Sequence, residues 1–124
     1  MDEGAWDVVD RLVEWLDASS RLSPETERLL RLMKLSEEVG EVAQAVIGAT
    51  GQNPRKGVTH TWDDVQSELC DVIVTAMVAL ATFDSDARTL FAAHLERVAQ
   101  RSFVVDFAAD SVVGLSDEHS DWRV

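Results

Sequence analysis

Residues 34–41 read KLSEEVGE, and residues 68–79 read ELCDVIVTAMVA. Each stretch contains two acids three positions apart. Because an α-helix turns by about 100° per residue, such acids lie one turn apart on the same face of a helix. Each stretch therefore predicts a helix with a pair of carboxylates on one face. The pairs are Glu38 with Glu41 and Glu68 with Asp71.

Apolar residues flank both acidic pairs, which sets them apart from ordinary surface charges. Two such pairs facing each other across a helix interface would repel strongly at low dielectric constant. A cation is needed to offset them, and carboxylate oxygens without histidine or thiolate partners favour a hard ion, Mg²⁺ or Mn²⁺. Other acids are interpreted as solvated surface charges: Glu25, Glu27, Asp63, Asp84, Asp86 and Glu96.

Apolar residues recur at helical spacing over four segments, and no alternation typical of a strand persists. The predicted helices cover about residues 5–18, 24–47, 62–83 and 86–101. Four amphipathic helices with short connections predict an all-α fold, either a four-helix bundle or a subunit of one.

Local signals define the ends of the second and third helices. Ser23 is a good N-cap and Pro24 fits the first helical position. Gly48 and Gly51 should end the second helix, and Thr61 can cap the third. The third helix is almost wholly apolar beyond residue 71 and should be the most buried element. The apolar stripe of the second helix comprises Leu29, Leu32, Leu35 or Met33, Val39, Val42 and Val46.

Composition limits the class of protein. The chain has 124 residues, 46% of them hydrophobic and 27% charged, as expected for one globular domain with its own core. Its 23 acidic and 11 basic side chains give a net charge of −12, which argues against a nucleic-acid partner and against docking on an anionic membrane. The apolar run Val72–Phe83 is too short to span a bilayer.

The lone cysteine, Cys70, excludes an internal disulfide, and the three histidines show no metal-ligand spacing. Together with an acidic N-terminus unlike a signal peptide, these features predict a soluble protein in the reducing cytoplasm. Residues 1–102 are expected to form the helical domain. Residues 103–124 are expected to be an acidic tail that packs on a partner subunit or is partly disordered.

The stretch Lys34-Leu35-Ser36-Glu37-Glu38-x-x-Glu41, followed by Glu68-x-x-Asp71, resembles the signature of MazG-like proteins. These belong to the all-α nucleoside triphosphate pyrophosphohydrolases, with dimeric dUTPases and phosphoribosyl-ATP pyrophosphohydrolase. The resemblance covers about residues 25–101 and implies a helical bundle completed by pairing of subunits into dimers or tetramers. It also implies cleavage between the α and β phosphates to give a nucleoside monophosphate and pyrophosphate, in a nucleotide house-cleaning role.

Mapped onto this chain, the resemblance implies that Mg²⁺ is held by Glu38, Glu41, Glu68 and Asp71. Glu37 would assist, as an extra ligand or by orienting the attacking water. Independently, a triphosphate carries about four negative charges, so a strongly acidic protein needs divalent ions to hold it and to activate water.

Phosphates beyond the metal ions need basic groups, and a base can stack on an aromatic ring. The phosphate-binding candidates are Lys34, Lys56, Arg97 and Arg101, with Arg55 beside Lys56. The stacking candidates are Trp62, which borders the loop before the third helix, and Trp15, which fits the apolar stripe of the first helix poorly.

Three other functions are known for helical proteins with paired acids or bound nucleotides. A di-iron carboxylate bundle needs Glu-x-x-His motifs, and no glutamate here has histidine three residues later. A related hydrolase acting on phosphoribosyl-ATP or dUTP has the same type of acidic motif. The motif binds metal and phosphates and does not contact the base, so it does not distinguish these substrates. A non-catalytic helical module that binds nucleotides or a protein also stays open.

Overall fold

The computed structural model describes residues 4–103, and within that range it contains four helices and no strand. This confirms the all-α fold class. The chain divides into two compact units, Met1–Ala87 and Arg88–Val124, and each is described by itself. The acidic tail predicted for residues 103–124 lies, apart from its first residue, outside the described range. The helices are α1 (Ala5–Ser19), α2 (Pro24–Thr50), α3 (Trp62–Phe83) and α4 (Ala87–Phe103).

The predicted cap residues act as expected at three helix ends. The Ser23 hydroxyl accepts a hydrogen bond from the Thr26 N–H at 3.2 Å, at the start of α2. Gly51 caps the end of α2 in the left-handed conformation, with φ of 64°. At the start of α3, Thr61 and Asp64 form a capping box with hydrogen bonds of 2.8 and 3.2 Å.

Helix α2 continues to Thr50, three residues past its predicted end, because Gly48 does not terminate it. Gly48 is buried, and the loop that follows α2 folds back over it. The Thr59 N–H donates to the Gly48 carbonyl at 3.0 Å, and a side chain at position 48 would clash with Thr59 and His60. The absence of a side chain at Gly48 lets the loop pack closely against α2, whereas Gly51 ends the helix.

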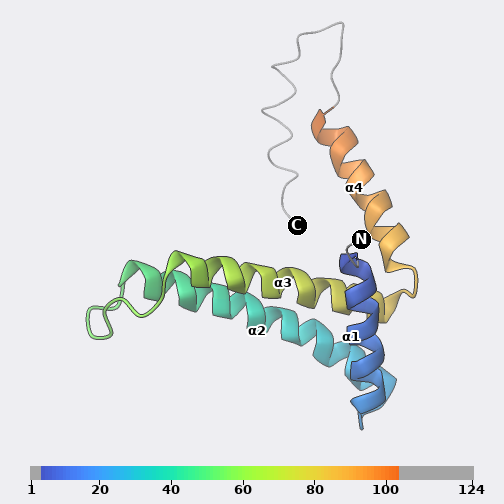
Figure 1. Cartoon of the computed structure of the whole chain (residues 1–124), viewed down its shortest axis with the longest axis horizontal. Coiled ribbons are helices and arrows are strands. Elements are labelled where there is room, and N and C mark those ends of the chain that lie inside the picture. Colours follow the sequence, from blue (N-terminus) through green and yellow to red (C-terminus); the bar gives the residue numbers. More distant parts are fainter. Residues whose placement is uncertain (1–3, 104–124) are drawn as a thin grey trace, which may run out of the picture. The chain divides into compact units, whose positions relative to one another are not determined.

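Helices α2 and α3 lie side by side and antiparallel, and α1 crosses the end of the pair where α2 begins and α3 ends (Figure 1). At that end the Arg31 guanidinium donates to the Thr82 hydroxyl at 2.9 Å, and the Arg28 guanidinium lies 5.9 Å from the centre of the Phe83 ring. The buried core of this unit consists of small side chains, which allow close approach of the helices. They are Val9, Ala45, Val65, Val78, Ala79 and Ala87.

Arg31 ties the three helices together and is only 7% exposed. Its guanidinium pairs with Asp17 of α1 at 2.8 Å and with Glu27 of α2 at 3.1 Å, in addition to Thr82 of α3. The prediction that Glu27 is a solvated surface charge was therefore wrong. Glu27 is half-buried, and it also accepts a hydrogen bond from the Ser20 hydroxyl at 2.5 Å.

The apolar stripe predicted for α2 coincides only in part with its packed face, since Leu35, Val42 and Val46 are half-buried. Arg31, Ala45 and Gly48 are the buried positions of α2, whereas much of the stripe is exposed. Helix α3 is also less buried than expected. On these two helices the exposed large apolar side chains include Leu29, Leu32, Met33, Val39, Ile73, Val74 and Phe83.

Helix α3 is long and apolar enough to cross a membrane, judged by length and composition alone. The apolar run Val72–Phe83, which alone is too short to span a bilayer, is only the second half of this helix of 22 residues. A core helix of a soluble protein passes the same test.

Candidate metal centre

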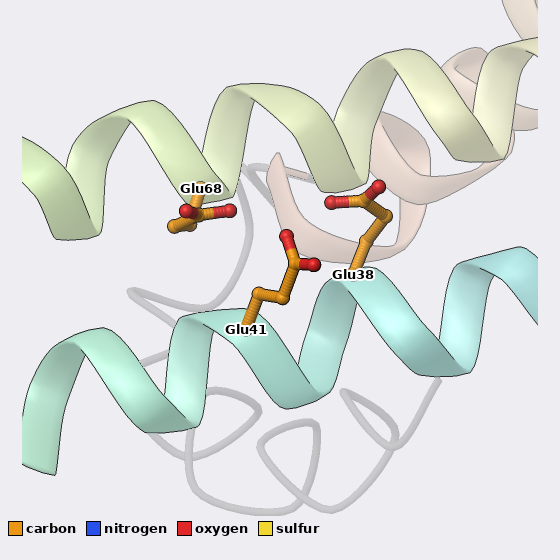
Figure 2. A group of neighbouring side chains, drawn as sticks. All are labelled: Glu38, Glu41 and Glu68. Atoms are coloured by element: carbon orange, nitrogen blue, oxygen red, sulfur yellow. The ribbon is translucent and has the colours of Figure 1, made fainter.

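Three glutamates converge between α2 and α3. Glu38 and Glu41 project from α2, and Glu68 projects from α3 toward them (Figure 2). One carboxylate oxygen of each residue lies within 4.8 Å of one oxygen of each of the others. All three side chains are half-buried. The structure thus brings together three of the four residues that the resemblance to MazG-like proteins implies as metal ligands.

Two of the carboxylate oxygens in this cluster are unsatisfied. Glu38 Oε2 and Glu68 Oε2 are buried, and neither finds a hydrogen-bond donor within the described part of the chain. A buried carboxylate oxygen without a donor loses its hydration and gains nothing in return. These two oxygens belong to residues of two neighbouring helices, and each residue also offers an oxygen to the converging group.

The pKa of the Glu38 carboxyl is raised above its ordinary value. Burial is the main cause, because it disfavours the charged form. The Glu41 carboxyl raises the pKa further through its charge and a hydrogen bond, and the Asp71 charge acts in the same direction. Lys34 opposes these effects. Lys34 therefore does not offset the negative charge around Glu38, and an added cation would stabilise the ionised carboxylate.

Lys34 and Glu37 lie at the border of the cluster. The Lys34 ammonium is 3.1 Å from the Glu37 carboxylate and 3.6 Å from that of Glu38. The hydrogen bond and charge of Glu37 raise the pKa of Lys34, so the ammonium stays protonated. The Glu37 side chain is 58% exposed, and the Glu38 side chain is 12% exposed. Glu37 thus holds Lys34 at the surface and is not part of the converging group.

Asp71, the fourth predicted metal ligand, is exposed and lies outside the converging group. It follows Glu68 by one helical turn, and its charge still acts on the Glu38 carboxyl. In this structure Asp71 therefore borders the cluster as a nearby negative charge.

The residues predicted to stack on the base or to bind phosphates from the loop lie at different positions within the first unit. Trp62 is exposed in the first turn of α3, and Lys56 is exposed in the loop before it. That loop is shaped by Asn53, whose side chain accepts from the Arg55 N–H at 3.0 Å. Trp15 is exposed and lines a surface pocket whose described walls all belong to α1.

The two arginine candidates of α4 belong to the second unit, so the cluster geometry does not include them. Both are exposed. The Arg97 guanidinium lies 3.4 Å from the His94 ring, and Arg101 is in the last turn of the helix.

Comparisons with protein-family models, with curated proteins and with solved structures found no match.

The donor set suits a hard divalent cation. It supplies carboxylate oxygens alone, two of them buried and without donors. Mg²⁺ and Mn²⁺ prefer oxygen ligands, whereas zinc sites in proteins usually include histidine or cysteine. Mg²⁺ usually keeps several waters and is bound by one or two carboxylates together with substrate phosphates. A cluster of three glutamates at the edge of a helix pair fits that pattern.

Proposed function

We propose that this protein is a Mg²⁺-dependent nucleoside triphosphate pyrophosphohydrolase. Water attacks the α-phosphorus, the α–β anhydride bond breaks, and the products are a nucleoside monophosphate and pyrophosphate. Glu38, Glu41 and Glu68 would hold the ion, with Asp71 adding negative charge at its border. Bound Mg²⁺ would neutralise phosphate charge and lower the pKa of a coordinated water.

The observation that carries the proposal is the pair of buried oxygens without donors, Glu38 Oε2 and Glu68 Oε2. A purely structural acidic cluster would be expected to have donors for its buried oxygens or to expose them to water. The order and spacing of the acids, which resemble those of MazG-like proteins, connect this cation site to triphosphate hydrolysis.

The remaining residues have supporting roles in the proposal. Lys34 lies beside the cluster and would meet substrate phosphates, while Glu37 keeps its ammonium in place and charged. Lys56 would contribute positive charge from the loop between α2 and α3. The exposed ring of Trp62 would stack on the base.

The test is product analysis with the whole chain. It is incubated with Mg²⁺ or Mn²⁺ and a panel of ribo- and deoxyribonucleoside triphosphates, and products are separated by chromatography. We expect monophosphate and pyrophosphate, and loss of both with EDTA. A diphosphate with inorganic phosphate would show that a different bond is cleaved.

Matched variants connect the products to the cluster. Glu41→Gln and Glu68→Gln should abolish turnover with the helices intact by circular dichroism. Glu25→Gln removes an exposed acid at the start of the same α2 and should leave turnover unchanged. No product from any triphosphate, with nucleotide binding retained, would favour a binding module. Turnover of phosphoribosyl-ATP alone would favour the specialised hydrolase.

A further inference from the structure

Lys34 has two carboxylate neighbours at different distances. Its ammonium donates a hydrogen bond to Glu37 Oε1 at 3.1 Å, and it lies 3.6 Å from Glu38 Oε1. The second distance is too long for a hydrogen bond, so that contact is an ion pair only. The Lys34 side chain is 50% exposed, and its flexible stem lets the ammonium move on the water side of α2. Glu37 therefore holds the ammonium, and the contact with Glu38 is the weaker of the two.

The Lys34 ammonium lies beside a carboxylate that the proposed function assigns to the ion. Glu38 Oε1 makes the ion pair with Lys34, whereas Oε2 of the same carboxylate is buried without a donor. An ion bound by Glu38 would therefore be close to the ammonium, and like charges at short distance repel. Burial and the Glu41 charge raise the pKa of Glu38, and Lys34 lowers it. The ammonium thus stabilises the ionised carboxylate when no ion is bound, and a divalent ion must compete with it.

A divalent ion alone does not balance the charges of the cluster. Glu38, Glu41 and Glu68 carry three negative charges when ionised, so a divalent ion leaves one of them uncompensated. A triphosphate brings about four more, and the loaded cluster repels it unless another positive charge is close. An ammonium makes strong, charge-assisted hydrogen bonds with phosphate oxygens. A triphosphate would therefore draw Lys34 away from Glu38 and remove the repulsion that the ion meets there.

We propose that Lys34 determines the form in which this site takes its ion: it disfavours a free divalent ion and favours an ion bound together with a triphosphate. Glu37 is the positioning residue, because its hydrogen bond keeps the ammonium at the border of the cluster. Ion and triphosphate each raise the affinity for the other, and this coupling is reciprocal. The inference rests on the proposed function, since it takes the cluster as a site for Mg²⁺ and a triphosphate.

The first measurement is the affinity of the whole chain for Mg²⁺ alone, by isothermal titration calorimetry at about pH 8. Lys34→Gln removes the competing charge and should lower the dissociation constant about threefold or more. Arg21→Gln removes the same charge at an exposed position before α2 and should leave the affinity unchanged. Lys34→Arg keeps the charge and should keep the wild-type affinity. Equal affinities of the wild type and Lys34→Gln would overturn the inference.

A double-mutant cycle separates a positioning role of Glu37 from a role as metal ligand. Glu37→Gln leaves the ammonium with Glu38 as its neighbour and should raise the dissociation constant for Mg²⁺ about threefold. In the Lys34→Gln background the same substitution should change it by less than about twofold, because there is no ammonium to hold. An equal loss in both backgrounds would show that Glu37 binds the ion directly, which contradicts the positioning role.

The second measurement uses inorganic tripolyphosphate premixed with Mg²⁺, which supplies a triphosphate chain without a base. Lys34→Gln should raise the dissociation constant of this complex about tenfold, opposite to its effect on Mg²⁺ alone. A substitution that only disturbs the fold would weaken the binding of both ligands, and circular dichroism checks that the helices persist. Weaker binding of both ligands by Lys34→Gln would overturn the inference. So would a wild type that binds Mg²⁺ but not the complex.

The inference and the proposed function fail in different ways. If neither the wild type nor Lys34→Gln binds Mg²⁺ at concentrations up to about 10 mM, the cluster is not a cation site and both fail. If the two proteins bind Mg²⁺ equally, only the role of Lys34 fails, and the product analysis still decides the reaction.

Discussion

The two oxygens of the Glu38 carboxylate have different surroundings. Oε1 lies 3.6 Å from the Lys34 ammonium, whereas Oε2 is buried without a donor. Replacing the charge by an amide removes the repulsion with Glu41 and supplies an N–H donor. Glu38→Gln should therefore raise the melting temperature of the metal-free protein by a few degrees.

The same substitution should remove the stabilisation by metal. A ligand that binds only the folded state stabilises it in proportion to the logarithm of its concentration. Mg²⁺ should raise the melting temperature of the wild type and of Glu25→Gln, and leave Glu38→Gln unchanged. Thermal unfolding followed by circular dichroism measures this. An equal Mg²⁺ effect in Glu38→Gln would exclude the cluster as the ion site.

Because the pKa of Glu38 is raised, two quantities should change with pH in opposite directions: the stability of the metal-free protein and the stabilisation by Mg²⁺. The Glu38 carboxyl keeps its proton to higher pH in the folded protein than in the unfolded chain. Without metal, the contribution of this group to the free energy of unfolding therefore falls as the pH rises through the interval between its unfolded and folded pKa values. Protonated Glu38 is a poor ligand, so the gain from Mg²⁺ should be full at about pH 8 and decline toward about pH 5. Melting curves over that range, with and without Mg²⁺, measure both trends.

Lys34 provides the control for the pH dependence. Its charge lowers the pKa of Glu38, so Lys34→Gln should raise that pKa further and move the loss of the Mg²⁺ effect to higher pH. Arg21→Gln, at an exposed position before α2, changes the net charge equally and should leave the profile in place. A shift in both variants would indicate a general charge effect.

At the scale of the helices, local signals were sufficient to identify the caps at three helix ends. Ser23, Gly51 and the Thr61–Asp64 box act through hydrogen bonds or backbone conformations within a few residues. Gly48 could not be interpreted in the same way. It accommodates a loop that returns to α2 eleven residues later, at Thr59, and that contact depends on the tertiary structure.

Which face of α2 packs on α3 could not be read from apolar periodicity, because apolar residues surround much of this helix. The facing positions, Arg31, Glu38 and Ala45, are mostly polar or small. Their seven-residue spacing was the available signal. Of the four acids that the sequence pairs on these helices, Glu38, Glu41 and Glu68 converge and Asp71 does not. Helical spacing places each pair on one face, and the pairing of α2 with α3 brings the three together.

Two glycines of α2 test this distinction between local and tertiary effects. A side chain at position 48 would clash with Thr59 and His60, so Gly48→Ala should destabilise the protein by about 1–3 kcal/mol. Position 40 is open, and Gly40→Ala should stabilise it by about 0.5–1 kcal/mol through helix propensity. Chemical denaturation measures both. Equal effects of the two substitutions would contradict the close approach of the loop.

At the scale of the whole molecule, acidic side chains outnumber basic ones by 23 to 11, and the net charge is −12. Three of the acids, Glu38, Glu41 and Glu68, converge between α2 and α3. This excess leaves the folded protein under strong repulsion between carboxylates.

Salt should therefore stabilise this protein. Raising NaCl from about 20 to 300 mM shortens the Debye length from about 20 to 6 Å, which screens carboxylates separated by more than one helix turn. We expect the melting temperature to rise by several degrees in the wild type and in Glu38→Gln. At equal ionic strength MgCl₂ should add a further rise in the wild type only, because site binding is distinct from screening. A melting temperature that falls with NaCl would mean that ion pairs such as Arg31 with Asp17 and Glu27 outweigh the repulsion.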